Sequence, residues 1–215
     1  MNEFELISRL TRALPTNDAV VIGAGDDCAV LECGDATDVE SVLKVMEDIK
    51  GPVYVRMLRG EIPRLFKDPM VFGRARVLSE GSDIVIVGFG PIVQRGLRVA
   101  ERLRASGLSV GVVNAIWARP IDDALYRRLG RSCTLIVTLE ESVAAGGFGG
   151  AVAESLAADQ AATGVPIRAT LLSIGIPAGA FVDHGSVADL RALIGLDESG
   201  IERQIRAAWG VLQGS

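Results

Sequence analysis

The feature that most constrains this fold is a regular alternation of short apolar runs with helix-like segments from residue 84 onward. Runs at residues 84–87, 110–113, 135–139 and 167–174 are mainly apolar, and residues 84–87 are β-branched and continuously apolar. That pattern is typical of strands that are buried on both faces. We therefore predict an α/β fold in which a mostly parallel sheet is covered by helices on both sides, giving three layers.

The segments between these runs carry apolar residues at spacings of three and four, which predicts helices. The segment after residues 88–91 should be helical up to Gly107, and further helices are expected at residues 121–129 and 151–162. Two more, at residues 187–194 and 198–209, should close the chain.

Composition excludes several classes of protein. The 215 residues are 49% hydrophobic and 23% charged, which suits one or two ordinary globular domains. The net charge of −5 gives no sign of a nucleic-acid-binding protein. No apolar run approaches the roughly 20 residues of a membrane span, and the first ten residues do not read as a signal peptide.

The cysteine and histidine content is equally restrictive. Cys28, Cys33 and Cys133 are the only cysteines and His184 is the only histidine. These residues cannot build a disulfide scaffold or a structural zinc site with four paired ligands. An odd number of cysteines without a secretion signal favours a reducing compartment, so we expect the chain in the cytoplasm.

The first residues carry a helical pattern and then a pair of acids. Residues 4–14 are predicted to be helical, and Asp26 and Asp27 lie between the short apolar runs 19–22 and 29–31. Adjacent carboxylates on a turn can hold Mg²⁺, usually together with phosphate oxygens. They equally suit a turn in which Asp bonds its own backbone, so the metal site is a weak prediction.

The next segment predicts a helix, a strand and a linker. Asp38 is expected to cap a helix whose apolar stripe contains Val39, Val42, Leu43 and Met46. Residues 53–58 read as a strand. Residues 59–78 combine proline, glycine and mixed charge, so we expect a linker and a domain boundary there.

Two glycine-rich turns invite a ligand-binding interpretation. Residues 88–90 (Gly-Phe-Gly) lack the third glycine of a dinucleotide-binding turn, and Pro91 favours a plain helix start. Residues 146–150 (Gly-Gly-Phe-Gly-Gly) precede a helix whose free amides could hold an anion. We favour a tight turn that lets this helix pack closely on the sheet.

Two arginines and the histidine remain as candidate functional residues. Arg56 and Arg59 lie near the end of the strand expected at residues 53–58, where an α/β sheet faces its ligands. A phosphate site and a solvated strand end fit this spacing equally well. The sequence has no Gly-x-Ser-x-Gly motif whose serine His184 could activate, so a structural or interface role is favoured over catalysis.

Many of these segments together resemble transketolases and the related 1-deoxyxylulose-5-phosphate synthases. The resemblance covers residues 34–209 and is carried by the segments at residues 34–41, 51–60, 83–90, 113–115, 119–122, 140–142, 146–150, 175–177, 181–186 and 195–197. It implies the end of a pyrimidine-binding domain followed by a complete transketolase C-terminal domain. Residues 3–10 and 23–31 instead resemble the start of thiamine-monophosphate kinase, in which the paired aspartates help to bind Mg²⁺ and phosphates.

The resemblance implies four segments. Residues 1–33 would be a kinase-like N-terminal segment, 34–60 a small truncated α/β remnant of the pyrimidine-binding domain, 61–82 a linker and 83–212 the C-terminal domain. The parts of the family that hold thiamine diphosphate and Mg²⁺, and the glutamate that activates the cofactor, have no counterpart here. Neither Glu32 nor Glu40 matches that glutamate.

We therefore assign no catalytic residue and expect the isolated chain to bind no cofactor. By resemblance, Arg59 rather than Arg56 would touch the substrate phosphate. Thiamine diphosphate and Mg²⁺ would require an N-terminal transketolase-like partner chain, and the pair would then move a ketol unit between sugar phosphates.

A non-enzymatic assembly domain and, more weakly, a kinase-related fusion are the alternatives to a split transketolase. The truncated segment should leave uncovered strand edges and apolar helix surface, which predicts a homo-oligomer, most simply a dimer. Leu43 is the main interface residue expected, with His184 a weaker candidate.

Overall fold

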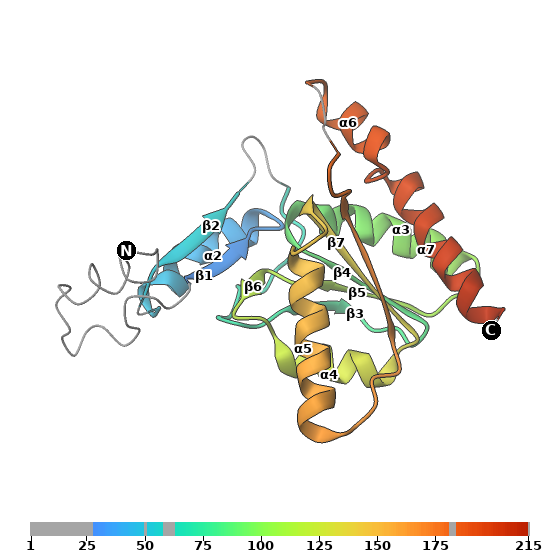
Figure 1. Ribbon diagram of the computed structural model, residues 1–215. Coiled ribbons are helices and arrows are strands. Elements are labelled where there is room, and N and C mark those ends of the chain that lie inside the picture. The colour runs from blue at the N-terminus through green and yellow to red at the C-terminus, as the bar shows by residue number, and fades with distance from the viewer. Residues whose placement is uncertain (1–27, 50, 58–62, 181–183, 215) are drawn as a thin grey trace, which may run out of the picture.

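The centre of the molecule is a five-stranded sheet in the order β3-β5-β4-β7-β8 (Figure 1). The computed structural model describes residues 28–49, 51–57, 63–180 and 184–214. Within this sheet β4, β5, β7 and β8 run parallel to one another. The strands are Arg76–Ser79 (β3), Ile84–Gly88 (β4), Val110–Asn114 (β5), Leu135–Val143 (β7) and Thr170–Ile176 (β8).

Both faces of this sheet are buried, as the continuous apolar runs predicted. Ile84 and Ile86 of β4 join one hydrophobic cluster, and the alternate residues Val85 and Val87 join the other. The first face is covered by Val93–Ala105 (α3) and Glu198–Gln213 (α7), the second by Asp123–Ser132 (α4) and Phe148–Thr163 (α5). Figure 1 shows the two helix pairs on opposite sides of the sheet. The predicted α/β fold class is confirmed.

The strand β3 lies inside residues 61–82, which the sequence predicted to be a linker. It forms an antiparallel edge of the large sheet, with Val77 paired to Val113 of β5. An edge strand needs apolar residues on one side only, and here Leu78 packs on the core while Val77 stays partly exposed. Four residues among prolines, glycines and charges are too few to show this pattern.

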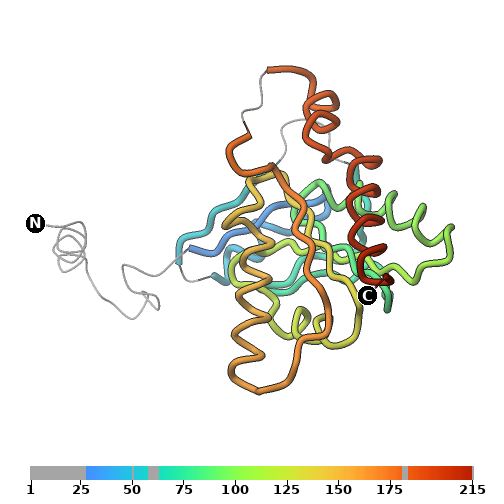
Figure 2. Tube along the Cα trace, turned by 45° about the vertical axis from the view of Figure 1, so that its right-hand side comes forward, coloured from blue at the N-terminus to red at the C-terminus, as the bar shows by residue number. Residues whose placement is uncertain are grey.

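A second, three-stranded sheet has the order β2-β1-β6 and lies beside the first (Figure 2). Its strands are Ala29–Glu32 (β1), Val53–Arg56 (β2) and Trp117–Arg119 (β6), and the helix Ala36–Glu47 (α2) connects β1 to β2. The sequence did not predict β6, which has only three residues. Because β6 comes from the C-terminal part of the chain, the truncated segment shares both its sheet and its core with that part. The shared core contains Leu31, Cys33, Val42, Met70, Ile116 and Trp117.

The N-cap of α2 is Asp35, and the prediction of Asp38 was wrong. Asp35 has an extended backbone, and its Oδ1 accepts from the amide of Asp38 at 2.9 Å. Asp38 lies one turn inside the helix and is fully buried. Its carboxylate is engaged by groups from other elements, so it has a tertiary role that helix patterning does not reveal.

Most of the other predicted elements are present with shifted ends. The turn at residues 88–90 leads into a short 3-10 helix, Gly90–Ile92 (η1), with Pro91 in its first turn, so the helix-start interpretation is confirmed. Val187–Ile194 (α6) matches its predicted bounds, and both figures show it projecting from the body beside α7. The predicted helix at residues 4–14 lies outside the described residues. None of the described helices combines the length and apolarity that crossing a membrane requires.

Candidate functional site

The carboxyl ends of β1 and β2 bring the side chains of a glutamate and an arginine together. Glu32 and Arg56 end their strands and are aligned in the parallel register, so their side chains leave the same face. Arg56 Nε lies 3.4 Å from Glu32 Oε1, and its guanidinium also donates to the carbonyl of Glu141 in β7 at 3.4 Å. Arg56 is thereby placed between β1 and β7, yet 43% of its side chain remains exposed.

Glu32 is the unusual member of this pair because it is only 2% exposed. Its Oε2 has no hydrogen-bond partner among the described residues. Burial raises the pKa of Glu32 to about 7; Arg56 opposes this rise, while the carboxylates of Glu141 and Glu140 add to it. A carboxyl group that changes charge near neutral pH beside an arginine is a candidate functional group.

Gly90 makes room for this carboxyl group. Its φ of +78° is a left-handed conformation, and a Cβ there would lie 2.3 Å from Glu32 Cδ. The turn at residues 88–90 is thus filled by an acid of the chain. A carboxylate at this place would repel a bound phosphate, which argues against the dinucleotide interpretation.

The second glycine turn, at residues 146–150, is also occupied by a carboxylate. Glu140 is fully buried, and its oxygens accept from the amides of Phe148 and Gly149 at 2.8 and 2.9 Å. The free amides at the start of α5 therefore hold an anion that belongs to the protein. A Cβ at position 147 would lie 2.1 Å from Glu140 Oε2, so only glycine fits there. The turn is therefore packed tightly, as predicted.

Glu141 links the strand ends to α6. Its Oε1 lies 2.5 Å from Arg191 Nε, and both side chains are largely buried. Burial and the nearby Arg191 guanidinium lower the pKa of Arg95 in α3. Several glutamates and arginines therefore gather at this edge of the molecule, and 43% of the Arg56 side chain among them is exposed.

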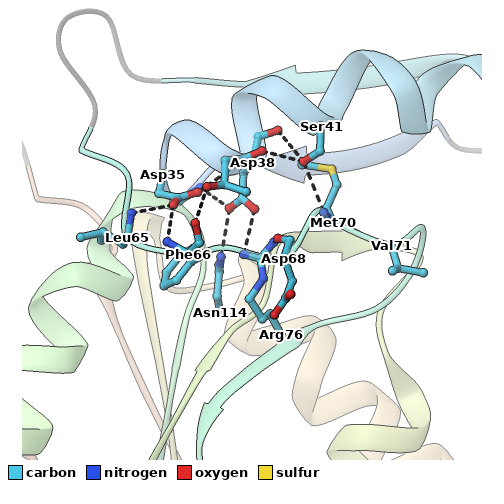
Figure 3. A network of polar contacts seen from close by, with 12 residues as sticks. Asp35, Asp38, Ser41, Leu65, Phe66, Asp68, Met70, Val71, Arg76 and Asn114 are labelled. Atoms are coloured by element: carbon cyan, nitrogen blue, oxygen red, sulfur yellow. Dashed lines mark hydrogen bonds and ion pairs between the residues drawn. The ribbon is translucent and has the colours of Figure 1, made fainter.

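A buried polar network fixes α2, and with it the end of β1, to the large sheet (Figure 3). Asp38 Oδ2 accepts from Asn114 Nδ2 of β5 at 3.0 Å, and Asp38 Oδ1 pairs with Arg76 of β3 at 2.9 Å. The same Oδ2 accepts from the amide of Gly34 at 3.0 Å. A fully buried carboxylate with several donors holds its neighbours in one arrangement.

Asp35 extends this network to the segment that leads into β3. Its Oδ2 accepts from the amides of Leu65 and Phe66 at 2.9 and 2.8 Å. Thr37 donates its hydroxyl to the carbonyl of Phe66 at 2.5 Å, and the amide of Met70 donates to Ser41 Oγ at 3.3 Å. Part of the predicted linker is thus bound to the first two turns of α2.

The predicted site residues do not all meet in one place. Arg56 lies in the Glu32 cluster, whereas Arg59, Asp26 and Asp27 fall outside the described residues. Leu43 is 69% exposed on α2, and His184 is exposed just before α6. In the part of the chain that the structure describes, no three His, Cys, Asp or Glu side chains converge as metal ligands would.

Sequence reasoning missed Glu32, Glu140, Glu141 and Arg191 as members of one cluster. A signal was present, because Glu32 and the pair Glu140 and Glu141 each follow an apolar run that forms a strand. Carboxyl ends of parallel strands meet at one edge of a sheet. Nothing in the sequence, however, shows that the small sheet lies with its strand ends against β7.

Comparison with protein families matches residues 73–201 to the family described as "Transketolase, C-terminal domain". The 1-deoxy-D-xylulose-5-phosphate synthase of Synechococcus sp. (strain JA-3-3Ab) is 37% identical over 170 residues, which cover 77% of this chain and 25% of that protein. The synthase of Polaromonas sp. is 38% identical over 184 residues, covering 83% and 27%. The chain therefore spans about a quarter of the length of the curated relatives it matches.

Solved structures give the same picture of the fold. A structure titled "Split gene transketolase, inactive beta4 tetramer" superposes with a TM-score of 0.73 at 28% identity, covering 94% of this chain and 60% of that one. A transketolase from Pichia stipitis, solved with sedoheptulose 7-phosphate, gives a TM-score of 0.66 at 15% identity, covering 89% and 26%. At that identity the likeness concerns the fold alone.

Proposed function

The chain belongs to the family of the transketolase C-terminal domain, and on this basis we propose that it is the C-terminal portion of a split thiamine-diphosphate enzyme. The complete enzyme would transfer a ketol unit between sugar phosphates. The observation that carries the proposal is the family match over residues 73–201. A split-gene transketolase among the similar structures supports it.

The substrate phosphate is the part of the reaction that this chain would bind. Arg56 keeps a partly exposed guanidinium at the carboxyl ends of β1 and β2, the edge at which α/β sheets bind ligands. Arg59, three residues further on, is the residue that the family resemblance favours. Arginine suits this task because its planar group can donate two parallel hydrogen bonds to a phosphate.

The cofactor would come with a partner chain. Thiamine diphosphate needs Mg²⁺ with several oxygen ligands, and the described residues supply no such set. In the described part of the chain the donor groups do not fit the diphosphate, so no chemical step is assigned to these residues. We also place the protein in the cytoplasm, where Cys28, Cys33 and Cys133, all free thiols here, would remain reduced.

We propose residues 34–57 as the pyrimidine-domain remnant and residues 76–213 as the C-terminal domain. This moves the start of that domain from residue 83 to β3, which pairs with β5. The shared sheet and the Asp38 network make the two parts one packed unit. The kinase-like segment at residues 1–33 falls almost wholly outside the described residues and remains a weaker alternative.

A non-enzymatic assembly domain is the second candidate, and exposed apolar side chains favour it. Leu43, Tyr54 and Met57 are 69%, 57% and 51% exposed on or next to α2 and β2. Apolar surface of this kind is typical of protein interfaces. This alternative predicts oligomers of the chain without a cofactor-bearing partner.

A capture experiment separates the two candidates. The tagged chain is expressed in its native organism, and the proteins that purify with it are identified by mass spectrometry. The split-enzyme proposal predicts a chain with a thiamine-diphosphate domain; recovery of this chain alone favours assembly. Calorimetry should then detect micromolar cofactor binding, about −8 kcal/mol, only for the mixture. Micromolar binding by the isolated chain would contradict the need for a partner.

Activity of the mixture tests the phosphate role. Arg59→Met should raise the KM for sugar phosphates strongly, and Arg56→Met should do so if both arginines contact the phosphate. Arg203→Met on the exposed surface of α7 is the matched control and should change nothing. An unchanged KM in both test variants would show that the substrate phosphate does not bind to Arg56 or Arg59.

A further inference from the structure

We propose that Glu32 controls anion binding at Arg56, so that a phosphate or other oxyanion binds there as Glu32 takes up one proton. The inference rests on the proposed role of Arg56 in binding phosphate. It gives a role to Glu32 and specifies how Arg56 exchanges this carboxylate of the chain for an oxyanion from solvent.

The geometry makes Glu32 and an incoming anion competitors for the same cation. Arg56 Nε lies 3.4 Å from Glu32 Oε1, and among the described residues the remaining guanidinium edge donates to the carbonyl of Glu141 at 3.4 Å. With 43% of the Arg56 side chain exposed, an oxyanion can reach the group from solvent. Two anions that share one guanidinium repel each other, so ionised Glu32 weakens the binding of the second.

The carboxyl group cannot relieve this competition by moving into water. Glu32 is 2% exposed, and its Cδ occupies the space that a side chain at position 90 would take. The amide of Glu32 is also bound to the carbonyl of Ile116 at 2.9 Å, which fixes the backbone at this point. Oε2 has no partner among the described residues, so it is the oxygen that can carry a proton at no cost in hydrogen bonds.

The charges around Glu32 favour the protonated form once Arg56 has another partner. Arg56 from β2 is the cation that faces it, while Glu140 and Glu141 of β7 are anions. Residues 90–92 of η1 and residues 115–117, which adjoin β6, bring no titratable side chain. When an oxyanion engages Arg56, it weakens the interaction that holds Glu32 ionised, and a proton from solvent replaces it.

Sulfate binding to the chain at two pH values tests the proposal directly. Sulfate keeps its charge between pH 6 and pH 8, so any change in affinity belongs to the protein. With the pKa of Glu32 near 7, the wild-type affinity should fall about tenfold from pH 6 to pH 8, following the protonated fraction. Glu32→Gln should bind sulfate equally at both pH values, and at pH 8 more tightly than wild type.

Control variants separate this effect from general electrostatics. Glu40→Gln removes the acid of the exposed Glu40–Arg64 pair and should keep the full pH dependence. Arg56→Met should abolish binding. If Arg56→Met abolishes binding but wild type shows no pH dependence, Glu32 does not control the site while the phosphate role of Arg56 stands. If Arg56→Met binds sulfate as well as wild type does, or if wild type itself binds no sulfate, Arg56 is not an anion-binding residue. The inference then fails together with the proposed role of Arg56.

Direct titration of wild-type Glu32 needs no variant. The ¹³C signal of its carboxyl carbon should change with a midpoint near pH 7, and saturating sulfate should move that midpoint upward. A midpoint below pH 5, or one that sulfate leaves in place, would overturn the proposal even if sulfate binds at Arg56.

Discussion

Asn114 Nδ2 donates to Asp38 Oδ2 across 3.0 Å and so joins the end of β5 to the first turns of α2. Both residues are fully buried. The bond connects the large sheet to the helix that packs on the small sheet, and its carboxylate acceptor makes it stronger than a bond between neutral groups. This bond and the Asp38–Arg76 pair join α2 to β5 and β3 beside the shared hydrophobic core.

Asp38→Ala should destabilise the fold by about 3–5 kcal/mol, because the largely buried Arg76 loses its carboxylate partner and the buried Asn114 Nδ2 loses its acceptor. Chemical denaturation measures the loss, and hydrogen exchange should show that protection falls first in β1 and α2. The matched control is Glu40→Ala on the exposed side of the same helix, which should change stability little. Equal losses for the two variants would mean that the network does not bind the sheets together.

Glu32→Gln should alter how stability depends on pH. The pKa of Glu32 is raised from 4.5 to about 7 in the folded protein, so folding disfavours its ionised form. Wild-type stability should therefore decline as pH rises from about 4.5 to about 7, by up to about 3 kcal/mol, and then level off.

Denaturation of Glu32→Gln at pH 5 and pH 8 should show that this decline is missing. Glu154→Gln on the exposed surface of α5 is the control and should follow wild type. A variant that loses as much stability as wild type between the two pH values would assign the decline to other groups.

Gly90→Ala should cost more stability than the same change at Gly107. Both glycines have a positive φ, of +78° and +93°, so each substitution pays about 1–2 kcal/mol of backbone strain. Only at Gly90 does the new Cβ meet the buried carboxyl group of Glu32; at Gly107 no other described residue beyond the chain neighbours lies within 4 Å of the new Cβ. The overlap should add about 1–3 kcal/mol.

The same measurement in a Glu32→Ala background identifies the cause of the extra loss. If crowding of Glu32 is responsible, the additional penalty of Gly90→Ala should largely vanish there, as a double-mutant cycle would report. A penalty that persists in that background would point to η1 itself.

Leu43→Asp should dissociate the predicted oligomer without unfolding the chain. Leu43 is 69% exposed in the single chain, so a charge there costs no core packing but disrupts an apolar interface. Light scattering gives the mass and circular dichroism reports folding. The control is Val165→Asp, 42% exposed in the connection between α5 and β8, which should keep the oligomer intact. A wild-type monomer at micromolar concentration would contradict the predicted assembly.

The sequence predicted the large sheet well because its central strands carry their own signal. A strand buried on both faces is apolar nearly throughout: residues 84–87 are entirely apolar, and residues 135–139 are apolar except for Thr138. The edge strand β3 and the three-residue β6 have no such pattern. Their pairing is decided by neighbours distant in sequence, which no local spacing encodes.

The site was less predictable than the fold for a related reason. Arg56 could be singled out because arginine at a strand end is suggestive by itself. Glu32 gained its properties only from burial, from the space left at Gly90 and from the nearby carboxylates of β7. Likewise, the sequence pattern around Asp38 indicates a helix cap, and only the tertiary structure shows that Asn114 and Arg76 bind its carboxylate.

The placement of β6 beside β1 has a consequence for protein synthesis. Residues 29–32 and 53–56 leave the ribosome well before residues 117–119, which complete their sheet. Until then β1 has an unpaired edge, and Leu31 and Val42 lack the cover of Trp117 and Ile116. Translation therefore passes through an interval in which the nascent chain exposes the unpaired edge and apolar surface of the β1-α2-β2 unit. Fast elongation between these strands shortens the time available for aggregation.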